Sequence, residues 1–266
     1  MITCDILGPG TNNSGLGNQL FCVAATLGLA IKNNDAAAFP QLNRPPFDLY
    51  GRTIFHKLNK ASVLSTEAYR EPAYNSTIYH DIPYKPYMSL HGHFQSYKYF
   101  DHSKEEILNF FELPAHITSR VNKKYSNLIK NSSNMVSLHI RRGDYIKLAG
   151  HYAVLDSNYY KAALDIQDKD EIVVFSDDIN WCKENLSFEN KKMFFIENEM
   201  DIIDMYLMSK IQNNILANST FSWWGAYLNN NKNRKIIGPQ DWFGPNRTKS
   251  NEIETKDLMP PDWIRI

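Results

Sequence analysis

Cysteine is scarce in this chain of 266 residues, which contains only Cys4, Cys22 and Cys182. The three are odd in number, lie far apart and form no C-x-x-C pair. This pattern argues against a disulfide-stapled scaffold and against a zinc cage, and it fits a reducing compartment.

Long apolar runs are also missing. The longest, LFCVAATLGLAI at residues 20–31, is too short to cross a bilayer and indicates a buried helix. The first ten residues carry Asp5 and no basic cluster, so we expect no secretory signal peptide there. These absences predict a cytoplasmic protein, and they leave peripheral association with the inner membrane face open.

The chain has no net charge, because 29 basic residues balance 29 acidic ones. Nucleic acids and anionic membranes call for a broad positive surface, so we expect neither a nucleic acid partner nor an anionic membrane face. Any anion must therefore be bound locally. The remaining composition, 43% hydrophobic and 22% charged residues, is ordinary for a globular protein with one large core or two smaller ones.

From residue 135 onward, apolar strands alternate regularly with helices. We expect strands at 135–140, 171–176, 192–196, 213–218 and 235–238. The intervening helices are expected at 158–166, 179–185, 201–210 and 221–229. Such alternation predicts a parallel sheet that is covered on both faces, as in nucleotide-binding α/β domains.

The first half of the chain is less regular. We expect short strands at 2–7 and 36–39, a strand end at the start of 89–100, and amphipathic helices at 103–111 and 117–129, with loops and short elements over 41–87. The Asn- and Ser-rich stretch 130–134 marks a boundary. The predicted organisation is therefore an N-terminal α/β lobe, residues 1–131, and a C-terminal lobe, residues 132–266.

Polar clusters follow four of the predicted strands of the second lobe. They are RRGD at 141–144, SDD at 176–178, NSTFS at 218–222 and PQDW at 239–242. Open parallel sheets bind ligands beyond the carboxyl ends of their strands. Short Ser, Asn and Asp side chains also serve as helix N-caps, which is the alternative for each cluster alone. Four clusters at one edge favour a binding site.

Arg141 and Arg142 must meet an anion, because a guanidinium group keeps its proton and is rarely buried unpaired. Arginine binds phosphate bidentately, and the start of the helix at 218–222 would offer hydroxyls and main-chain amides to the same group. The alternative partner is the carboxylate of Asp144. Neighbouring residues of extended chain point in opposite directions, so we expect one arginine in the site and the other in the scaffold.

Two further motifs are weaker. GLGNQL at 15–20 lies between a strand and a helix, but Leu20 replaces the third glycine of a dinucleotide fingerprint, so a nicotinamide site is disfavoured. Its glycines would let the backbone approach a ligand closely. Asp177 and Asp178 could hold Mg²⁺, and His91 with His93 could hold another metal, but neither pair has a third ligand at a supporting spacing. We expect no required metal.

Five segments, in chain order, resemble the bacterial α-1,2-fucosyltransferases of glycosyltransferase family eleven. They are GLGNQLF, GHFQSYKYF, HIRRGDY, SDDINWCKENL and LANSTFSWWGAYLN. The resemblance runs from Gly15 to about Trp242 and is loosest over 41–87. One departure is in GHFQSYKYF, where the family often has Tyr at His93 and an acidic residue at Tyr97.

This resemblance implies an α/β, GT-B-like fold with two Rossmann-type lobes whose parallel sheets face a cleft. It implies GDP-β-L-fucose as donor and the 2-hydroxyl of a terminal β-galactoside as acceptor, with inversion and without a metal or other cofactor. The acceptor could belong to an O-antigen unit, a capsule repeat or a milk-type oligosaccharide, either free or lipid-linked.

The resemblance also implies roles for individual residues. Arg141 and Arg142 would bind the phosphates, and Asn18 would lie near the fucose. The implied catalytic residues are Arg141, Arg142, Asp144 and Asn18, and the implied donor-binding residues are His139, Asp177, Asp178, Asp204, Asn218, Ser219, Thr220, Phe221 and Gly17. No general base is singled out among Asp144, Asp156 and His151.

Three alternatives stay open. The first is a fucosyltransferase of another linkage, α-1,3 or α-1,6, that shares the donor site. The second is a glycan-binding protein that has lost catalysis, which the intact HIRRGD and NSTFS segments disfavour, because a lectin has no use for a diphosphate site. A nicotinamide oxidoreductase ranks last.

Overall fold

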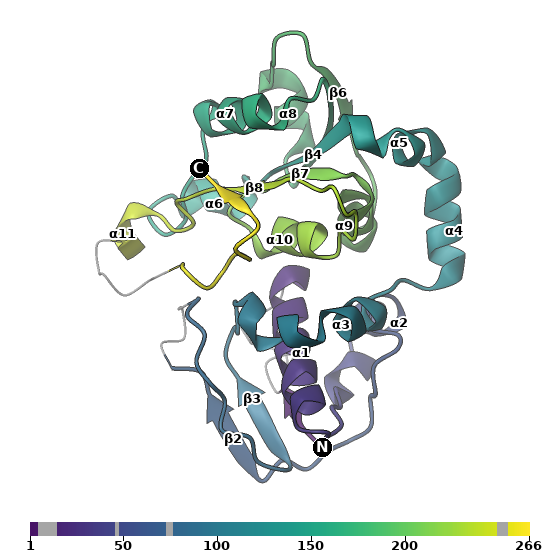
Figure 1. Cartoon of the computed structure of the whole chain (residues 1–266), viewed down its shortest axis with the longest axis vertical. Helices are drawn as coiled ribbons and strands as arrows, with labels where there is room; N and C mark the ends of the chain where they lie inside the picture. Colours follow the sequence, from purple (N-terminus) through teal and green to yellow (C-terminus); the bar gives the residue numbers. More distant parts are fainter. Residues whose placement is uncertain (5–14, 46–47, 73–76, 249–254) are drawn as a thin grey trace. The chain divides into compact units, whose positions relative to one another are not determined.

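The computed structural model describes residues 1–4, 15–45, 48–72, 77–248 and 255–266, and it divides into two compact units (Figure 1). Unit 1 comprises Met1–Ser119 and Ile253–Pro260, and unit 2 comprises Arg120–Glu252 and Pro261–Ile266. Each unit is built on a parallel sheet, so the predicted pair of α/β lobes is confirmed.

The division differs from the expected boundary at residue 131. It falls inside α4 (Ala115–Lys124), and a C-terminal segment returns to unit 1. The Asn- and Ser-rich stretch is no linker, since it forms η5 (Ser132–Asn134) and the carbonyl oxygen of Ser132 accepts a hydrogen bond from the amide of Gln212 at 3.3 Å. Composition marks polar turns but does not show which unit they are bonded to.

Unit 2 contains a six-stranded sheet in the order β6-β5-β4-β7-β8-β9, and every neighbouring pair is parallel. The strands are β4 (Met135–Ile140), β5 (Glu171–Ser176), β6 (Lys192–Phe195), β7 (Asn213–Ile215), β8 (Ile236–Gly238) and β9 (Ile264–Arg265). Counted within the unit, the order is 3-2-1-4-5-6, that of a doubly wound nucleotide-binding sheet. The direction of winding reverses between β4 and β7, so a ligand is expected at their carboxyl ends.

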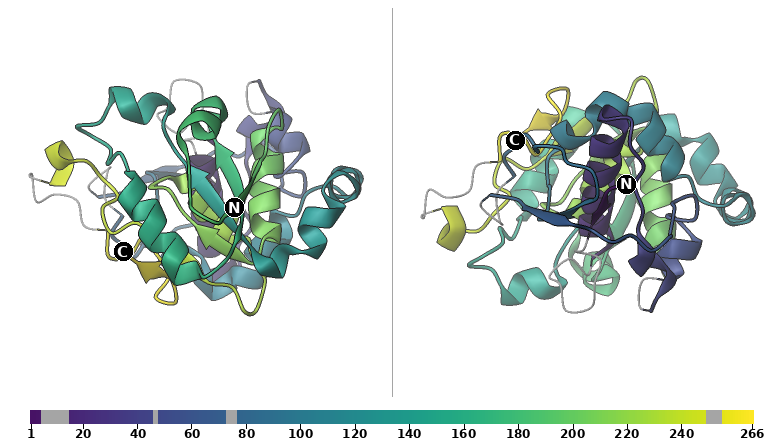
Figure 2. Two further views of the ribbon diagram at one scale, coloured as in Figure 1. Left: turned by 90° about the horizontal axis from the view of Figure 1, so that it is seen from above. Right: turned by 90° about the horizontal axis from the view of Figure 1, so that it is seen from below.

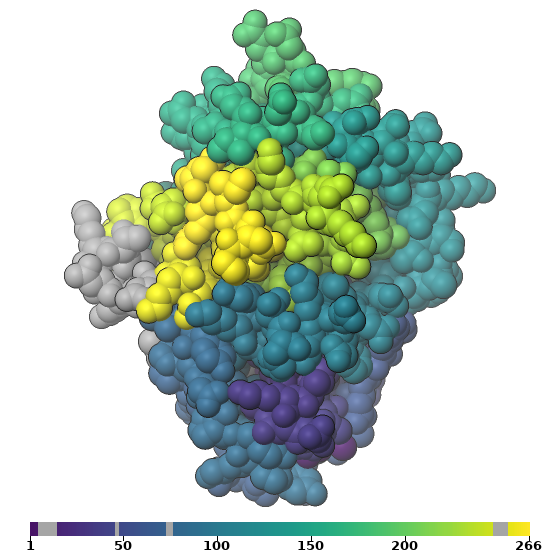
Figure 3. Space-filling view, viewed as in Figure 1, coloured from purple at the N-terminus to yellow at the C-terminus, as the bar shows by residue number. Residues whose placement is uncertain are grey.

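Most of these strands are predicted by the sequence, and β4 and β5 have the predicted bounds. β7 ends three residues earlier than expected, because residues 216–218 continue past the sheet towards the next helix. β9 is missed, since two residues cannot show an alternating pattern. It pairs with β8 and forms the sheet edge, where Ile264 is 36% exposed and the C-terminal segment is visible at the surface (Figure 3).

Helices cover both faces of this sheet (Figure 2). On one face, α7 (Ser157–Gln167) and α8 (Ile179–Asn185) pack their buried residues against the alternate β4 side chains Val136, Leu138 and Ile140. α9 (Asp201–Lys210) packs against α10 (Thr220–Tyr227), and the ring of His139 on β4 lies 5.4 Å from that of Phe221 on α10. Because successive strand residues point to opposite faces, His139 faces α10.

Two aspartates begin the helices of the first face. The Asp156 carboxylate accepts hydrogen bonds from the amides of Asn158 and Tyr159 at the start of α7, and Asp178 accepts one from Trp181 at the start of α8. Such caps satisfy amides that have no partner within the helix. Asp168 ends α7 in the left-handed region with φ 50°. The remaining helices of unit 2 are α5 (Ser126–Lys130), α6 (Gly143–Lys147) and α11 (Pro245–Thr248).

Unit 1 contains a three-stranded parallel sheet, β1-β3-β2, built from β1 (Thr3–Cys4), β2 (Glu67–Arg70) and β3 (Met88–His91). The strand expected at 36–39 is reduced to a single parallel bridge between Ile2 and Ala37. The expected strand at 2–7 extends beyond the described residues. The helical elements are α1 (Leu16–Lys32), η2 (Pro40–Asn43), α2 (Asp48–Arg52), η3 (Tyr97–Tyr99), η4 (Asp101–Ser103) and α3 (Lys104–Phe110).

Helix α1 is the apolar helix predicted by the sequence, and nearly all its residues are buried. Within the described parts of the chain, no helix is long and apolar enough to span a membrane.

Asn214 of β7 holds the centre of the unit 2 sheet together. Its side-chain amide donates to Ser137 Oγ of β4 at 2.6 Å and to the carbonyl of Met208 in α9 at 2.9 Å. Its oxygen accepts from the amide of Asn229 at 2.8 Å, and Asn214 is 1% exposed. Fully satisfied buried polar networks fix one arrangement of a core, because any other leaves polar groups unpaired.

We predict that Asn214→Ala lowers the free energy of unfolding by about 3 kcal/mol, because it leaves buried donors and acceptors without partners. Chemical denaturation would measure this. Asn185→Ala is the matched control, since that amide makes one exposed hydrogen bond to Trp181, and we expect less than about 1 kcal/mol there. Equal losses in the two variants would contradict the role of Asn214.

Candidate active site at the carboxyl ends of β4 and β7

The predicted donor residues of unit 2 gather where the sheet reverses its winding. His139, Arg141 and Arg142 end β4 or follow it, Asp177 and Asp178 follow β5, and Ser219 to Phe221 begin α10 after β7. β4 pairs with both β5 and β7, so these three segments leave the sheet at one edge. Three of the four sequence clusters thus lie at one edge of the sheet.

Arg141 binds two carboxylates. Its Nη2 donates to Asp144 Oδ1 at 2.6 Å, and its Nη1 lies 3.1 Å from Asp177 Oδ2. The structural ion pair weighed from the sequence is therefore formed. Its partner Asp144 is half exposed, and exposed ion pairs contribute little stability, so another anion can replace Asp144 at small cost.

Arg142 is the more enclosed of the two arginines, with 18% of its side chain exposed against 31% for Arg141. Its Nε donates to Asp178 Oδ2 at 3.2 Å, and its guanidinium carbon lies 3.3 Å from the centre of the Trp181 ring. The main-chain amide of Arg142 also donates to Asp177 Oδ1 at 2.9 Å. The ring and carboxylate fix this guanidinium group, and the sequence gives no sign of Trp181 as its partner.

The two arginines therefore differ in their surroundings, and the expected division into one site arginine and one scaffold arginine stays a prediction. Arg141 is more exposed and has an exchangeable partner, whereas Arg142 is held by a ring and a helix-capping aspartate. Two guanidinium groups face three carboxylates here, so the cluster is not cationic by itself. An anion that binds here would compete with these carboxylates for the guanidinium hydrogen bonds.

In the residues of unit 2 that are predicted to bind the sugar donor, three buried polar atoms have no hydrogen-bond partner among the described residues. They are His139 Nδ1, Arg141 Nε and Asp204 Oδ1. Burial costs such atoms a hydrogen bond, and a native protein tolerates this mainly where a ligand or water completes the bond. These atoms mark places where a polar ligand gains from binding.

Burial shifts the protonation of two of these groups. Burial, and secondarily the charge of Arg141, lowers the pKa of His139 to about 3, so its imidazole is neutral at physiological pH. Burial, reinforced by the neighbouring charges of Glu199 and Asp201, raises the pKa of Asp204 to about 7. His139 can therefore donate or accept one hydrogen bond but cannot act as a fixed cation.

The side chains of Asn218 and Ser219 are engaged in the scaffold. Asn218 donates its two amide hydrogens to the carbonyls of Ala153 and Trp242, both at 2.8 Å. Ser219 Oγ caps α10 by accepting from the amide of Phe221 at 3.3 Å. The capping alternative is therefore present at Ser219 and at Asp178. A direct donor contact through the Asn218 amide nitrogen is not supported, since both its hydrogens are in use.

Tyr145 is a residue of this site that sequence reasoning missed, although it ends the segment HIRRGDY. Its hydroxyl donates to the Asn218 carbonyl at 3.1 Å, and its ring stacks on Tyr152 at 4.1 Å. The guanidinium carbon of Arg141 lies 5.2 Å from its ring centre. Tyr145 thus links the segment after β4 to the segment after β7.

The two remaining predicted residues, Gly17 and Asn18, belong to unit 1. They lie in the first turn of α1, where Gly17 is buried and Asn18 Oδ1 accepts from Gln95 Nε2 at 3.1 Å. The donor and catalytic predictions therefore fall on both units. Each role stays a prediction.

The acids and histidines that were weighed as metal ligands have other partners in the structure. Asp177 and Asp178 bind arginines, and His91 shares a hydrogen bond with Ser89 Oγ at 2.9 Å. Across the described residues, no three His, Cys, Asp or Glu side chains come close enough together to hold a metal ion.

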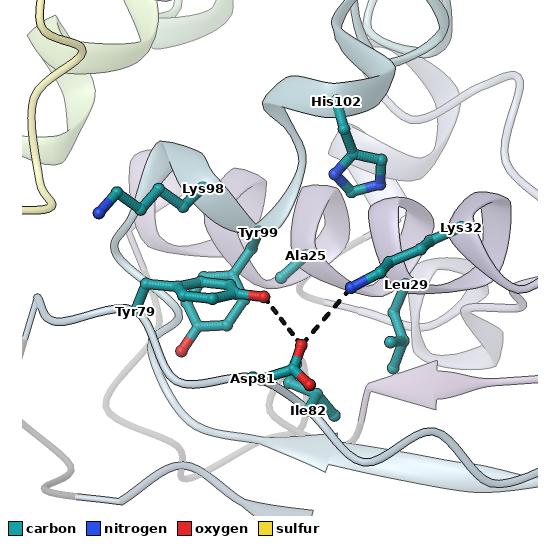
Figure 4. A pocket seen from close by; sticks show the side chains of 9 residues that line it. All are labelled: Ala25, Leu29, Lys32, Tyr79, Asp81, Ile82, Lys98, Tyr99 and His102. Atoms are coloured by element: carbon teal, nitrogen blue, oxygen red, sulfur yellow. Dashed lines mark hydrogen bonds and ion pairs between the residues drawn. The ribbon is translucent and has the colours of Figure 1, made fainter.

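Unit 1 also contains a cavity of 270 Å³ between α1 and the segments around Tyr79 and Tyr99 (Figure 4). The hydroxyl of Tyr79 and the amine of Lys32 both point at Asp81, at 3.0 and 3.5 Å. Lys98, on the same wall, binds Asp257 at 2.6 Å. Because these polar groups already bind one another, the cavity defines no ligand.

The fold of unit 2 is that of doubly wound, nucleotide-binding α/β proteins, and sequence comparison places the chain further. The profile of Glyco_transf_11, glycosyl transferase family 11, matches residues 15–266. The chain belongs to this family.

Similar proteins agree with this family assignment, both those that match nearly the whole chain and one that matches two thirds of it. The O-antigen biosynthesis glycosyltransferase WbnK of Escherichia coli is 38% identical over 66% of this chain, a match that spans 60% of that relative. An alpha-1,2-colitosyltransferase of Escherichia coli is 29% identical over 95% of this chain and 96% of its own. The galactoside alpha-(1,2)-fucosyltransferase 2 of Bos taurus is 30% identical over 94% of this chain and 76% of its own.

Among solved structures, the NodZ alpha-1,6-fucosyltransferase soaked with GDP-fucose is similar, with a TM-score of 0.53. The match covers 80% of this chain and 89% of that one at 12% sequence identity. At that identity the likeness supports the fold alone. The predicted α/β architecture of GT-B type is confirmed by it and by the two parallel sheets.

We predict that Gly143→Ala weakens GDP binding about tenfold. An added Cβ would lie 2.4 Å from Asp177 Oδ2, so Asp177 must leave Arg141 and the main-chain amide of Arg142. Isothermal titration with GDP measures the effect. Gly150→Ala is the control, because its Cβ would meet only the amide of the Asn246 side chain, and unchanged affinity is expected. Equal affinity for all three proteins would contradict the role of Asp177.

Proposed function

We propose that this protein is a fucosyltransferase that transfers L-fucose from GDP-β-L-fucose to the 2-hydroxyl of a terminal β-galactoside, forming an α-1,2 linkage. The observation that carries the proposal is the arginine pair beyond β4, at the winding reversal of a family 11 glycosyltransferase. α-1,2 transfer is the linkage in the names of two relatives that each match more than nine-tenths of the chain.

The proposed chemistry follows from the charges that develop during transfer. As the bond between sugar and phosphate breaks, the departing GDP gains negative charge, and Arg141, Arg142 and the amides at the start of α10 stabilise it. Binding that strengthens as the bond breaks lowers the barrier, whereas binding that is equal before and after does not.

Exchange of carboxylates is the way in which the diphosphate would enter. Asp144 is half exposed, and its ion pair with Arg141 is therefore partly open to solvent. Asp144 is the carboxylate that the diphosphate would replace. Asp177 and Asp178 would stay and orient the two guanidinium groups. Asp144, once released, would lie beside the leaving group as a carboxylate and could accept the acceptor proton.

The other candidates for a general base are less suited. The Asp156 carboxylate caps α7 through two amide hydrogen bonds, which ties it to the scaffold. His151 has no hydrogen bond to the arginine cluster among those formed by described side chains. Of the three candidates left open by the sequence, Asp144 is therefore favoured as the general base.

We assign recognition of the sugar donor to the buried polar atoms of unit 2 that have no hydrogen-bond partner among the described residues. Neutral His139 and the Arg141 Nε would bind the nucleotide, and a carboxylate such as Asp204 can accept both N–H groups on one edge of guanine. Burial raises the pKa of Asp204 to about 7, and its ionised form would be the one that accepts both hydrogen bonds. Phe221, 5.4 Å from His139, would offer a ring face beside it.

A second candidate donor is GDP-colitose, because a colitosyltransferase matches the chain over nearly its full length. Colitose is fucose without the 3-hydroxyl, so the two donors share the nucleotide, the phosphates and the anomeric centre. The arginine cluster does not distinguish them. A site that hydrogen-bonds the 3-hydroxyl would disfavour colitose strongly, since its polar groups would stay unpaired.

We further propose that transfer inverts the anomeric centre and requires no metal, because two arginines and helix-start amides would supply the hydrogen bonds that stabilise a departing diphosphate. The acceptor is proposed to be a galactose-terminated oligosaccharide or lipid-linked glycan, in the cytoplasm. The three described cysteines are free and buried, which supports a reducing compartment.

We predict that Arg141→Ala or Arg142→Ala lowers kcat by at least about 100-fold, because a charged hydrogen bond to the leaving group is lost. Steady-state transfer from GDP-fucose measures this. The control is Arg52→Ala, which removes an exposed arginine whose ion pair is with Asp48, and it should keep normal turnover. Near-normal turnover in both test variants would contradict the proposed site.

The donor and the metal are tested together. With EDTA present, we expect transfer from GDP-fucose to lactose, with the product fucosylated at galactose O2 as read by NMR. GDP-colitose is offered in parallel, and a higher kcat/KM for it would assign the second donor. Activity that EDTA abolishes and Mg²⁺ restores would contradict metal independence. A product linked elsewhere would contradict the linkage.

A further inference from the structure

The three strands of unit 1 end at one edge, and three polar segments meet there. α1, which follows β1, begins with Asn18 in its first turn. Glu71 directly follows β2, and the turn of residues 92–95 directly follows β3. The parallel order β1-β3-β2 brings the segments together at the side where parallel sheets bind ligands.

Glu71 is a carboxyl group bonded chiefly to the main chain. Its Oε2 accepts hydrogen bonds from the amides of His93 at 2.7 Å and Phe94 at 2.9 Å, and its Oε1 accepts one from the Tyr99 hydroxyl at 3.4 Å. Only 6% of the residue is exposed, and it forms no ion pair with any described residue. A buried acid without a cation is costly, so a role beyond packing is indicated.

The turn after β3 depends on these hydrogen bonds. Phe94 is buried with φ 49°, a left-handed conformation that a side-chain-bearing residue adopts only when its surroundings impose it. Gly92 lies so close that an added Cβ would be 2.4 Å from Glu71 Cβ. The Cys22 thiol donates to the Gly92 carbonyl at 3.4 Å and ties the turn to α1.

This turn also positions Gln95, whose side-chain amide donates to Asn18 Oδ1 at 3.1 Å. Without the Glu71 hydrogen bonds, Phe94 could relax to negative φ, which redirects the chain at Gln95. We propose that Glu71 is a positioning residue of the transfer reaction, which holds the 92–95 turn so that Gln95 orients Asn18 towards a sugar hydroxyl at the carboxyl edge of the unit 1 sheet. The inference rests on the proposed function.

Ionisation of Glu71 strengthens its hydrogen bonds to the turn but lowers the stability of the fold. Burial raises its pKa to about 7, against about 4.3 in an unfolded chain, so the fold binds a proton there that the unfolded chain has released. The stability contributed by the protonated group is present below about pH 4.3 and is lost as the pH rises through 7. The ionised group is the stronger acceptor for the two amides. Tyr69, Tyr99 and Cys22 also face it, and burial raises the pKa of each away from neutrality.

Glu71→Gln in the full chain is the first test, because it keeps the size and an acceptor oxygen but removes the charge. We expect kcat/KM for the acceptor to fall at least tenfold at pH 8, with GDP affinity within twofold of the wild type. The melting temperature should rise relative to the wild type as the pH goes from 5.5 to 8. A purely structural residue would lower stability and activity together.

A double-mutant cycle shows whether Glu71 acts through Gln95. In a Gln95→Met background, Glu71→Gln should cost less than threefold in kcat/KM, because the contact it supports is already gone. The matched control is Asp35→Asn, which removes another unit 1 carboxylate that accepts a main-chain amide, from Ala36 at 2.7 Å, and a tyrosine hydroxyl, from Tyr84 at 3.2 Å. Its effect should multiply with that of Gln95→Met. His91 and His93 are the same in every variant, so they do not affect the comparison.

Wild-type kinetics for Glu71→Gln, or full multiplication with Gln95→Met, would overturn the inference. Hydrogen exchange separates it from the proposed function. If the wild type transfers no sugar from either GDP donor, the proposed function fails. Even then, loss of amide protection in both segments 92–96 and 15–19 of the Glu71→Gln variant would support the positioning contact. Unchanged protection in both segments would overturn it.

Discussion

The pairing of β4 with β7 is the constraint on which the rest of unit 2 depends. β4 is bonded to β5 on one side and to β7 on the other, and the chain reverses its winding between β4 and β7. The buried amide of Asn214 fixes that pair by bonding Ser137 and Met208 at once. Moving β7 by one residue would turn its side chains to the other face and break this network.

Everything at the site follows from where these strands end. The arginines leave β4 beside the aspartates that leave β5, and α10 begins just beyond β7. Tyr145 ties the first segment to the third through the Asn218 carbonyl. The scaffold therefore supplies the rigidity, while the exchangeable ion pair of Arg141 and Asp144 supplies a place for an incoming anion. A site that is neutralised by its own carboxylates stays folded without a ligand, and under the proposed function it would exchange one of them for a phosphate.

Acids with compensated and uncompensated charge occur in both units. In unit 2, the aspartates beside the arginines are paired, whereas burial raises the pKa of Asp204 to about 7. In unit 1, Glu71 has only amides and a tyrosine hydroxyl around it, and burial raises its pKa to about 7. Uncompensated burial of an acid is a cost to the fold, and such costs gather where a protein needs a fixed backbone conformation, here at Phe94.

By itself, the sequence determined the α/β class, the bounds of β4 and β5, and the polar clusters at the strand ends, because apolar runs and strand-end polarity are local patterns. The resemblance of five segments added the family. Only the tertiary structure decided that Arg142 rests on Trp181, that the Asn218 amide is used by Ala153 and Trp242, and that Glu71 holds the turn at Phe94. These contacts join residues dozens of positions apart, and no local pattern encodes a pairing that depends on which strands are neighbours. The boundary between the units was misplaced for the same reason, since the stretch 130–134 owes its place to a hydrogen bond with Gln212 rather than to its composition.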